Sequence, residues 1–566
     1  MVGHIINTRV DSVRISGHNR GMEQSRSNGD GNSSSAKTAG KKNVYGPEDV
    51  DDINFDLDIV RPGVPPYRRG IYPQGFAEHS WTKKLISGYG TPESTRARQD
   101  VLLAAGQGSW DAIPLHLVVD IPTANGMDSD DPLAVDDVGL CGVAMDSIDD
   151  MDPLLSGLPL DKLNTTFILS GAAPMLLGMY IAYMTSHGID EKELRGQVWN
   201  NPLSEYISSM YPPISPDASL RMMTDTIEYC ARNVPKFRAV NLDGYNVREA
   251  GSTAVQEVAF VIAEGIELIR ETVKRGVSPE AAAQTLTFTW ASHSDFFEEI
   301  AKFRAAREVW SRSLSRLFDI HDARSLRMKA NVQTAGSTLT AAKPLGNVAR
   351  VALEALAAVL GGCQSLHTSS YDEALGIPTE HAVTIALETQ RIIQVESGVE
   401  EVTDPLGGSW YLERLTSDMV DKITAEVERI EEGGGFLALI KSGQLQQEIS
   451  AEAWRTYQAR QALLSRDQVE ADDDEVVIEE EQPTVFRVTK EDQEHQIQRV
   501  QQTRRDRDPG EWERALKEIE RAALANENLM PAFIQGAKAR ATVGEMIGVI
   551  RSSLGDSTFV SVIAGV

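Results

Sequence analysis

Short apolar runs alternate with amphipathic helical segments through the middle of this 566-residue chain, and this alternation restricts its fold more than any other feature. Apolar runs bounded by turn residues predict buried strands, and periodic segments such as residues 254–276 predict helices. The predicted strands are Pro114–Asp120, Asn164–Ser170, Gly196–Asn200, Phe237–Asp243, Thr285–Trp290, Leu326–Gln333 and Gln364–Thr368.

Repeated strand–helix units of this length favour an α/β fold with a parallel sheet closed as a (β/α)8 TIM-type barrel. An open doubly wound sheet is the alternative. We expect the eighth strand near Glu401–Asp404. Polar segments follow three of the predicted strands, at residues 243–246 (DGYN), 333–336 (QTAG) and 366–369 (LHTS). In a barrel, such positions form the catalytic face.

The flanks of this region differ from it in composition. Residues 1–55 are too polar to bury a core and predict a disordered segment, whereas residues 56–464 hold the predicted barrel. Residues 465–483 carry two acidic runs, which predict a solvated linker that acts as a plain tether. Residues 484–566 return to helical periodicity and predict a small helical C-terminal extension.

The charge balance and the cysteines exclude several classes of function. The chain has 55 basic and 83 acidic residues, a formal net charge of −28. Such a surface repels nucleic acid and anionic membranes, so we expect neither as a partner, although a locally basic pocket could still bind an anionic small molecule. Cys141, Cys230 and Cys363 lack metal-ligand or disulfide spacing, and neither a membrane span nor a signal peptide is apparent. We expect a soluble cytoplasmic protein without a metal site.

Generic site motifs do not identify the chemistry. There is no Walker loop, GxSxG, HExxH or paired CxxC. Residues 319–324 (DIHDAR) superficially match the DxHxxG signature of cobalamin-binding domains, but the glycine is missing and the segment lies between a predicted helix and a predicted strand. We interpret His321 as an exposed loop residue. The extension is also short for a Rossmann-like cobalamin domain, so we expect this chain to lack that module.

Eight stretches carry a specific resemblance. They are MDSDDP (127–132), VGLCGVAMD (138–146), GYNVREAG (244–251), FFEEIAKFRAA (296–306), QTAGSTLT (333–340), QSLHT (364–368), DEALGIP (372–378) and DPLGGS (404–409). In this order they resemble the substrate-binding subunits of the adenosylcobalamin-dependent acyl-CoA mutases, a family that includes methylmalonyl-CoA, isobutyryl-CoA and 2-hydroxyisobutyryl-CoA mutases. The C-terminal extension resembles that of isobutyryl-CoA mutase large subunits.

The resemblance implies a radical carbon-skeleton isomerisation. Such enzymes use adenosylcobalamin to generate the radical, while the barrel positions an acyl-CoA thioester and excludes side reactions. In two-subunit members, a separate small subunit binds most of the cofactor and covers the carboxyl ends of the barrel strands. The resemblance therefore implies an acyl-CoA substrate, a small cobalamin-binding subunit as partner, and a hetero-oligomer.

The resemblance assigns catalytic positions to Tyr245, Asn246, Asn331 and Gln333. Tyr245 matches a tyrosine between substrate and corrin, although a core tyrosine with a satisfied hydroxyl is the alternative. Gln333 matches a glutamine near the substrate. Asn246 and Asn331 stand where the family has histidines. Asparagine can still donate a neutral hydrogen bond to a carbonyl, but it cannot act as an acid and its reach is shorter.

The resemblance also implies a set of substrate-binding positions: Tyr72, His79, Thr82, Lys84, Ile86, Val118, Thr166, Trp199, Ser209 and Thr287. His79 and Thr285 replace arginines that bind CoA phosphates, whereas Lys84 keeps one positive charge. Losing two such contacts, at about 1.5–3 kcal/mol each, would weaken CoA binding by orders of magnitude. Trp199 replaces a glutamine and is expected to fill part of the pocket.

Four further positions match residues that face the cofactor: Glu249, Gly336, Glu373 and Ala374. Glu249, Glu373 and Ala374 match residues that pack on the corrin or contact the adenosyl group. Gly336 matches a glycine that lets the backbone approach the corrin. For Glu249, a charge that stabilises a helix N-terminus is an equally good interpretation.

The substrate positions favour an uncharged acyl group. Ile86 and Ser209 stand where a tyrosine and an arginine hold the carboxylate of methylmalonyl-CoA, and a buried carboxylate without such partners is costly. Val118 replaces the aspartate that 2-hydroxyisobutyryl-CoA mutase uses for the substrate hydroxyl. Three functions stay open: an active mutase with an isobutyryl-like substrate, a non-catalytic paralogue acting as a structural or regulatory subunit, and a radical mutase acting on a carrier other than CoA.

Overall fold

The computed structural model describes residues 42–104, 113–134, 136–208, 214–470 and 488–556. Its strands form two parallel sheets, one with the order β1-β9-β8-β7-β6 and the other with the order β2-β3-β4-β5. The strands are β1 (Thr82–Lys83), β2 (Ile113–Val118), β3 (Leu163–Ile168), β4 (Arg195–Val198), β5 (Phe237–Arg238), β6 (Val240–Asp243), β7 (Leu286–Ser292), β8 (Ala330–Thr334) and β9 (Ser365–His367).

The two sheets join into one closed barrel. Only Ala239 separates β5 from β6, so these two strands occupy a single barrel position. On the other side, a parallel bridge between Ser87 and Leu117 connects the chain that follows β1 to β2. Strand β1 in turn pairs with β9 through Thr82 and Ser365. The predicted (β/α)8 TIM-type barrel is therefore confirmed.

The eighth strand was predicted in the wrong place. Residues 401–404 form bends, and Asp404 has a left-handed backbone (φ 50°) while its carboxylate accepts hydrogen bonds from Arg69 and Arg304. The remaining barrel position is filled by β1, near the start of the barrel sequence. This strand has only two laddered residues, one of them a lysine, and a second lysine follows it, so no apolar run marks it. The sixth predicted strand also begins later than expected, at Ala330.

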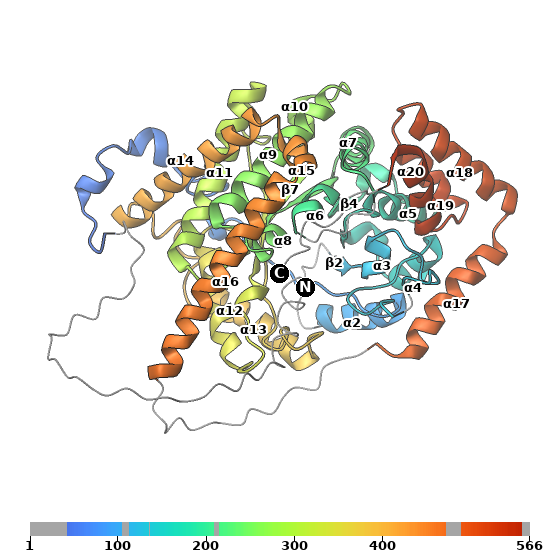
Figure 1. The fold of residues 1–566 in the computed structure, drawn as a ribbon, viewed down its shortest axis with the longest axis horizontal. Coiled ribbons are helices and arrows are strands. Elements are labelled where there is room, and N and C mark those ends of the chain that lie inside the picture. The colour runs from blue at the N-terminus through green and yellow to red at the C-terminus, as the bar shows by residue number, and fades with distance from the viewer. Residues whose placement is uncertain (1–41, 105–112, 135, 209–213, 471–487, 557–566) are drawn as a thin grey trace, which may run out of the picture.

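Helices surround the barrel, and Figure 1 shows α9, α11 and α14 side by side on one flank of it. The barrel helices are α2 (Pro92–Ala104), α3 (Ile121–Ala124), α4 (Met151–Leu155), α5 (Ala173–Ser186), α6 (Pro202–Ser208), α7 (Pro216–Asn233), α8 (Gly244–Glu249), α9 (Ala254–Val273), α10 (Pro279–Gln284), α11 (Phe296–Phe318), α12 (Gly346–Leu360) and α13 (Glu380–Glu396). After them come α14 (Trp410–Glu432), α15 (Phe436–Ser442) and α16 (Gln444–Glu470).

The hydrophobic core lies between the strands and this helical layer. Phe288 on β7 packs edge-to-face on Trp310 of α11 at 4.9 Å, and Phe167 on β3 packs on Tyr180 of α5 at 5.4 Å. Alternate residues of each strand point outward in this way, because successive side chains of a strand face opposite sides. The remaining residues of each strand face the barrel lumen.

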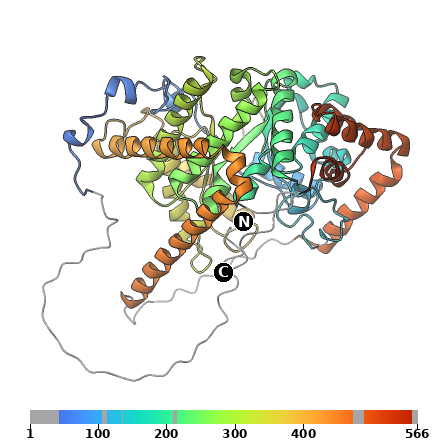
Figure 2. The same ribbon diagram turned by 45° about the horizontal axis from the view of Figure 1, so that its top comes forward.

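The chain after the barrel is helical, as predicted. It forms α17 (Lys490–Asp506), α18 (Pro509–Leu524), α19 (Met530–Lys538) and α20 (Val543–Leu554). Figures 1 and 2 show these helices at one end of the molecule, where α19 and α20 pack against α5. Arg504 on α17 pairs with Asp128 at 2.6 Å and with Asp130 at 2.5 Å, which ties the extension to the loop after α3.

Two predicted segments need correction. Residues 47–50 form the 3-10 helix η1 and residues 55–59 form the π-helix η2, and Val50, Ile53 and Ile59 pack together. The described part of the segment predicted as disordered is therefore structured, while residues 1–41 lie outside the described residues. Helix α16 continues to Glu470, so the predicted linker does not begin at residue 465. Most of that linker lies outside the described residues.

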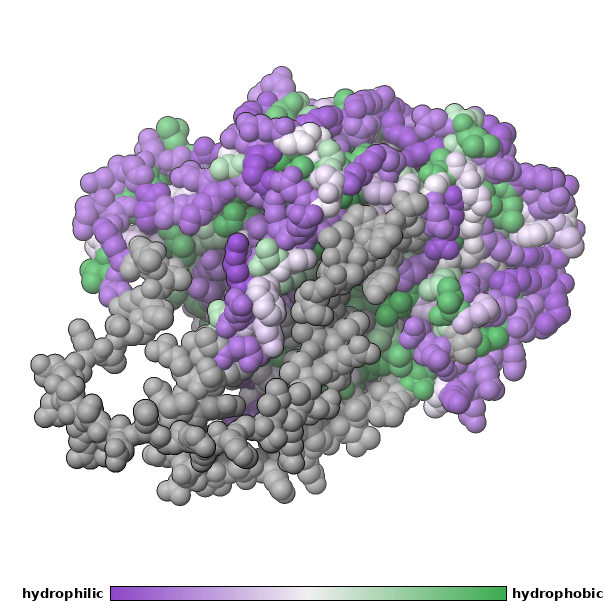
Figure 3. All heavy atoms as spheres, in the orientation of Figure 1, coloured by the Kyte–Doolittle hydropathy of each residue, from purple (hydrophilic) through white to green (hydrophobic). Residues whose placement is uncertain are grey.

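The face of the molecule seen in Figure 3 is mainly polar, and hydrophobic side chains appear on it in small separate patches. Within the described residues, no helix combines the length and the apolar character that a membrane crossing requires. His321, predicted as a loop residue, lies outside the helices and strands with 79% of its side chain exposed.

Candidate functional site

The lumen of the barrel is lined with polar side chains rather than with the branched apolar residues that usually fill a barrel of this type. Strand alternation shows this clearly on β3. Thr165 points outward, where its hydroxyl meets that of Tyr180 at 3.1 Å, whereas Thr166 points inward. Most of the substrate-binding and catalytic positions expected on strands share this inward parity.

A chain of hydrogen bonds connects five residues that face the lumen from five different strands. The His116 Nδ1 and the Thr166 hydroxyl are 3.1 Å apart, and Gln197 donates from Nε2 to Thr166 at 3.4 Å. Thr287 donates to Gln197 Oε1 at 3.1 Å, and Asn241 donates from Nδ2 to Thr287 at 2.9 Å. Gln197 is half-buried and the others are buried, so the polar layer lies well inside the barrel. Thr166 and Thr287, both expected as substrate-binding residues, are linked in this layer through Gln197.

Lys84 follows β1 and is buried in the lumen. Burial lowers the pKa of its ammonium to about 7, and its Nζ lies 5.3 Å from the ring centroid of Trp199. Burial, and then the nearby Lys84 charge, lower the pKa of His116 well below its ordinary value. Burial also lowers the pKa of His367 to about 4. Lys84 and Trp199, expected as substrate-binding residues, thus lie close together.

Four expected residues gather at the carboxyl ends of the strands. A Cβ at Gly336 would lie 3.2 Å from Glu249 Oε2 and 3.3 Å from the Tyr245 hydroxyl, so these three residues meet. Glu249 accepts hydrogen bonds from Ser337 N at 2.8 Å and from its hydroxyl at 3.0 Å. Burial, together with the nearby Glu249 charge, raises the pKa of Glu373 to about 7. Burial and the same two carboxylates raise the pKa of Tyr245.

The start of α8 fixes Asn246 in place. Asp243 caps this helix by accepting from the Asn246 backbone N–H at 3.1 Å, and it accepts from the Asn246 side-chain Nδ2 at 2.6 Å. Burial raises the pKa of Asp243 to about 7. One amide proton of Asn246 is therefore already engaged by a neighbour on its own helix.

The other expected catalytic residues lie on β8. Asn331 accepts a hydrogen bond from the Ser365 hydroxyl on β9, which holds its side chain toward the amino end of the lumen. Gln333 is buried two residues further along the strand, opposite His367 in the parallel register. Asn331 and Gln333 therefore share the lumen but lie at different depths in it.

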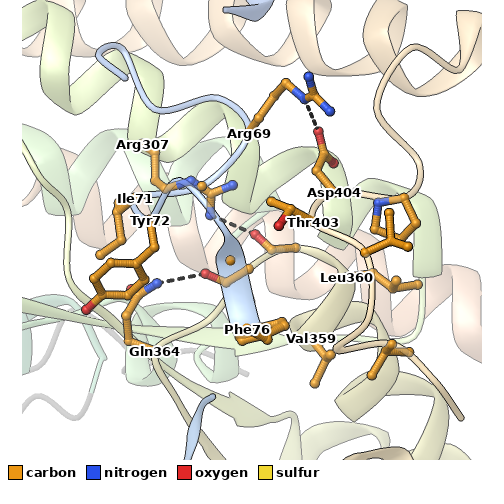
Figure 4. Close-up of a pocket in the computed structure, with 17 residues that line it drawn as sticks. Arg69, Ile71, Tyr72, Phe76, Arg307, Val359, Leu360, Gln364, Thr403 and Asp404 are labelled. Atoms are coloured by element: carbon orange, nitrogen blue, oxygen red, sulfur yellow. Dashed lines mark hydrogen bonds and ion pairs between the residues drawn. The ribbon is translucent and has the colours of Figure 1, made fainter. Parts of the chain in front are cut away.

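Tyr72 and His79 lie at the amino ends of the strands. Their rings are 4.6 Å apart, and Tyr72 lines a small cavity with Phe76, Arg307 and Gln364 (Figure 4). The guanidinium of Arg307 is turned away to backbone carbonyls, including Gly361 at 2.7 Å. The side chain of His79 is mostly exposed.

The remaining expected positions are scattered along the barrel. Ile86 and Val118 are half-buried near the carboxyl ends of β1 and β2, Thr82 is exposed, and Ala374 is half-buried beside Glu373. Thr285 donates its hydroxyl to the carbonyl of Ala282 at 2.7 Å, which ends α10. Ser209 lies outside the described residues.

Sequence reasoning missed three lumen residues, His116, Gln197 and Asn241, and it included Asp243 and His367 only within the polar segments expected at the catalytic face. Strand parity could have found them. In the run PLHLVVD, the polar residue at position 116 alternates with Leu115 and Leu117, so it must face the side opposite the helices. The run itself was recognised only as a buried strand.

The chain resembles known proteins over most of its length. The sequence profile of the family described as methylmalonyl-CoA mutase matches residues 34–556. The chain is 37% identical over 520 residues to the 2-hydroxyisobutanoyl-CoA mutase large subunit of Aquincola tertiaricarbonis, covering 90% of each chain. It is 36% identical to methylmalonyl-CoA mutase of Rhizobium meliloti, covering 91% of this chain and 72% of the relative. It is 34% identical to mitochondrial methylmalonyl-CoA mutase of Homo sapiens, covering 91% and 68%.

Proposed function

Because this chain belongs to the methylmalonyl-CoA mutase family, we propose that it is the substrate-binding subunit of an adenosylcobalamin-dependent acyl-CoA mutase, an intramolecular transferase. One observation carries the proposal. Tyr245, Glu249, Gly336 and Glu373 gather at the carboxyl ends of the strands, above a lumen that is lined with polar side chains. Such a lumen suits the amide-rich arm of a CoA thioester, with its acyl group held at the end where these four residues meet.

The residues at the carboxyl ends of the strands fit a large neutral cofactor. Gly336 has no Cβ in the 3.2–3.3 Å space beside Glu249 and Tyr245, which leaves its backbone open to close approach. Burial raises the pKa of Glu249, and it raises the pKa of Glu373 to about 7, so near neutral pH the Glu373 carboxyl can donate as well as accept hydrogen bonds to amide groups. Adenosylcobalamin bound there would supply the radical that abstracts a substrate hydrogen.

The protein's own residues would bind and orient the substrate. The Tyr245 ring is buried between the lumen and the carboxyl-end face, so it can separate the acyl group from the cofactor. Gln333 lies at the same end of the lumen and can position the thioester by hydrogen bonding. The surrounding barrel excludes water from the reacting atoms.

The acyl group is proposed to be uncharged and isobutyryl-like. Ile86 and Val118 present half-buried apolar side chains near the carboxyl ends of β1 and β2. A carboxylate held against them would be buried beside apolar groups at a high cost.

The partner is proposed to be a small cobalamin-binding subunit, giving a hetero-oligomer. The relative from Aquincola tertiaricarbonis is named as a large subunit, and this chain spans 90% of it. The name supports a two-subunit arrangement here as well.

The decisive experiment combines binding and turnover. Purified chain is titrated calorimetrically with isobutyryl-CoA, methylmalonyl-CoA and free CoA, and is then assayed for isobutyryl-CoA isomerisation with adenosylcobalamin and a small cobalamin-binding subunit. We expect micromolar binding of isobutyryl-CoA, weaker binding of methylmalonyl-CoA, and turnover that Gly336→Val abolishes while acyl-CoA binding persists. Absence of CoA-ester binding up to millimolar concentration would sink the proposal.

A non-catalytic role as a structural or regulatory subunit is the second candidate. It is favoured by Asn246, whose side-chain amide is held by Asp243 at 2.6 Å, and by Trp199, which occupies space inside the lumen. Binding of acyl-CoA without any turnover, together with a stable complex with an active mutase, would support this second function.

A further inference from the structure

Three buried polar atoms in the lumen have no hydrogen-bond partner within the described part of the chain. They are Lys84 Nζ, His116 Nε2 and Trp199 Nε1. The three residues are 3%, 5% and 7% exposed, and they come from three separate strand regions, after β1, on β2 and after β4. A buried polar group without a partner is destabilising, so three of them in one lumen require an explanation.

The three groups lie in the same part of the barrel. Lys84 Nζ is 5.3 Å from the Trp199 ring centroid, and its charge contributes to the lowered pKa of His116. The chain after β1 also runs beside β2, where Ser87 donates its backbone N–H to the carbonyl of His116 at 2.9 Å. The contact of the ammonium with the Trp199 ring is a cation–π interaction, but it provides no acceptor for the two ring N–H groups.

The hydrogen-bond network assigns all three atoms as donors. Thr166 accepts a hydrogen bond from Gln197 Nε2, so its own hydroxyl proton is free to be donated to His116 Nδ1. His116 is neutral because its pKa is lowered, and its single ring proton then resides on Nε2. Trp199 Nε1 is always a donor and never an acceptor. Lys84 Nζ is likewise a donor only while it is an ammonium.

We propose that Lys84, His116 and Trp199 form a donor site for an oxygen acceptor on the acyl end of the substrate. The inference rests on the proposed function and deepens it. The favoured acceptor is the thioester carbonyl, because Asp243 already engages one amide proton of Asn246 at 2.6 Å and leaves that side chain a single proton to donate. A second carboxylate on the acyl group presents the same chemistry.

The test compares ligands that differ only in the acceptor. S-isobutyryl-pantetheine carries the carbonyl, S-isobutyl-pantetheine is the thioether without it, and S-methylmalonyl-pantetheine adds a carboxylate. None has the nucleotide, so the result does not depend on how CoA phosphates are bound. Affinities are measured by calorimetry for wild type, Lys84→Met and Trp199→Phe, which remove single donors but keep bulk.

Lys83→Met is the matched control. Lys83 lies on β1 and directly precedes Lys84. Its side chain points away from the lumen, and its Nζ donates to Gln394 Oε1 at 2.6 Å. Circular dichroism and thermal unfolding of each variant show whether the barrel is intact.

We expect wild type to prefer the thioester over the thioether by about tenfold or more, because a site built to donate rejects a ligand without the acceptor. Lys84→Met and Trp199→Phe should each reduce this preference, whereas Lys83→Met should keep it. If Lys84→Met weakens only the methylmalonyl derivative, the donors serve a carboxylate, and the uncharged acyl group of the proposed function is wrong. Equal binding of all three ligands to wild type, or no binding at millimolar concentration, would overturn the donor site. If wild type prefers the thioester over the thioether but shows no turnover or does not bind CoA esters, the donor site stands and the proposed mutase function is refuted.

Discussion

Replacing Lys84 with methionine should stabilise the protein at low pH, and the size of the effect follows from its burial. The pKa of the ammonium falls from 10.5 to about 7 in the folded protein because water is excluded from it. Each tenfold loss of proton affinity corresponds to about 1.36 kcal/mol, so the folded state is destabilised by roughly 4–5 kcal/mol while Lys84 is charged. Methionine fills similar volume without this charge.

The pH dependence has a definite sign. Between pH 7 and about 10.5 the unfolded chain holds a proton on Lys84 that the folded protein has released, so wild-type stability rises with pH across this window. Below pH 7 both states are protonated and the full destabilisation is present. The stabilising effect of Lys84→Met should therefore be largest at pH 6 and should shrink steadily toward pH 10.

The assay is thermal unfolding followed by circular dichroism at pH 6, 7.5 and 9. Lys83→Met serves as the control, since its ammonium is half-buried and bonded to Gln394, and we expect it to produce no comparable stabilisation at pH 6. A Lys84→Met protein that unfolds at a lower temperature than wild type at pH 6 would refute the reasoning, because it would mean that the buried ammonium has a compensating partner.

Two further predictions concern the other charged groups. Burial raises the pKa of Asp243 to about 7, so between about pH 4 and pH 7 the folded protein holds a proton that the unfolded chain has lost, and the free energy of unfolding should fall as pH rises. Asp243→Asn should flatten this profile, and its free energy of unfolding should exceed that of wild type by roughly 2–4 kcal/mol at pH 8. Parallel thermal-unfolding profiles of the two proteins would contradict this expectation. Arg504→Ala should leave Asp128 and Asp130 without their ion pairs and loosen α17, at about 1–2 kcal/mol for this partly exposed arginine. Hydrogen exchange of α17 should then accelerate. Arg505→Ala is the control, since this arginine donates to Gln502 on its own helix, and it should leave the exchange unchanged. Equal protection of α17 in both variants would count against the docking role.

The main predictions from sequence were the barrel and the family. Apolar runs bounded by turns placed most of the strands, because buried strands need consecutive apolar residues and the helices need a periodic face. The same reasoning placed the last strand at residues 401–404 instead of at Thr82–Lys83. A strand of two laddered residues that includes a lysine has too little apolar content to be distinguished from a loop.

The candidate site was predictable only in part. Ordered motifs identified Tyr245, Glu249, Gly336 and Glu373, and the structure brings these residues together. Positions such as Lys84 and Trp199 were assigned singly, without any indication that they meet across the lumen. His116 was not assigned at all, since one polar residue in a buried run carries no information about its partners.

The sequence by itself determined the strand–helix repeat, the family and the residue types that face the carboxyl ends of the strands. These properties depend on local periodicity and on short motifs, both of which involve residues that are close together in the sequence. Only the tertiary structure decided that Asp243 holds Asn246 and that Lys84, His116 and Trp199 share one desolvated space. Closing the barrel brings β1 beside β2 and β9 and excludes water from between them, and that exclusion creates both the altered pKa values and the unpaired donors.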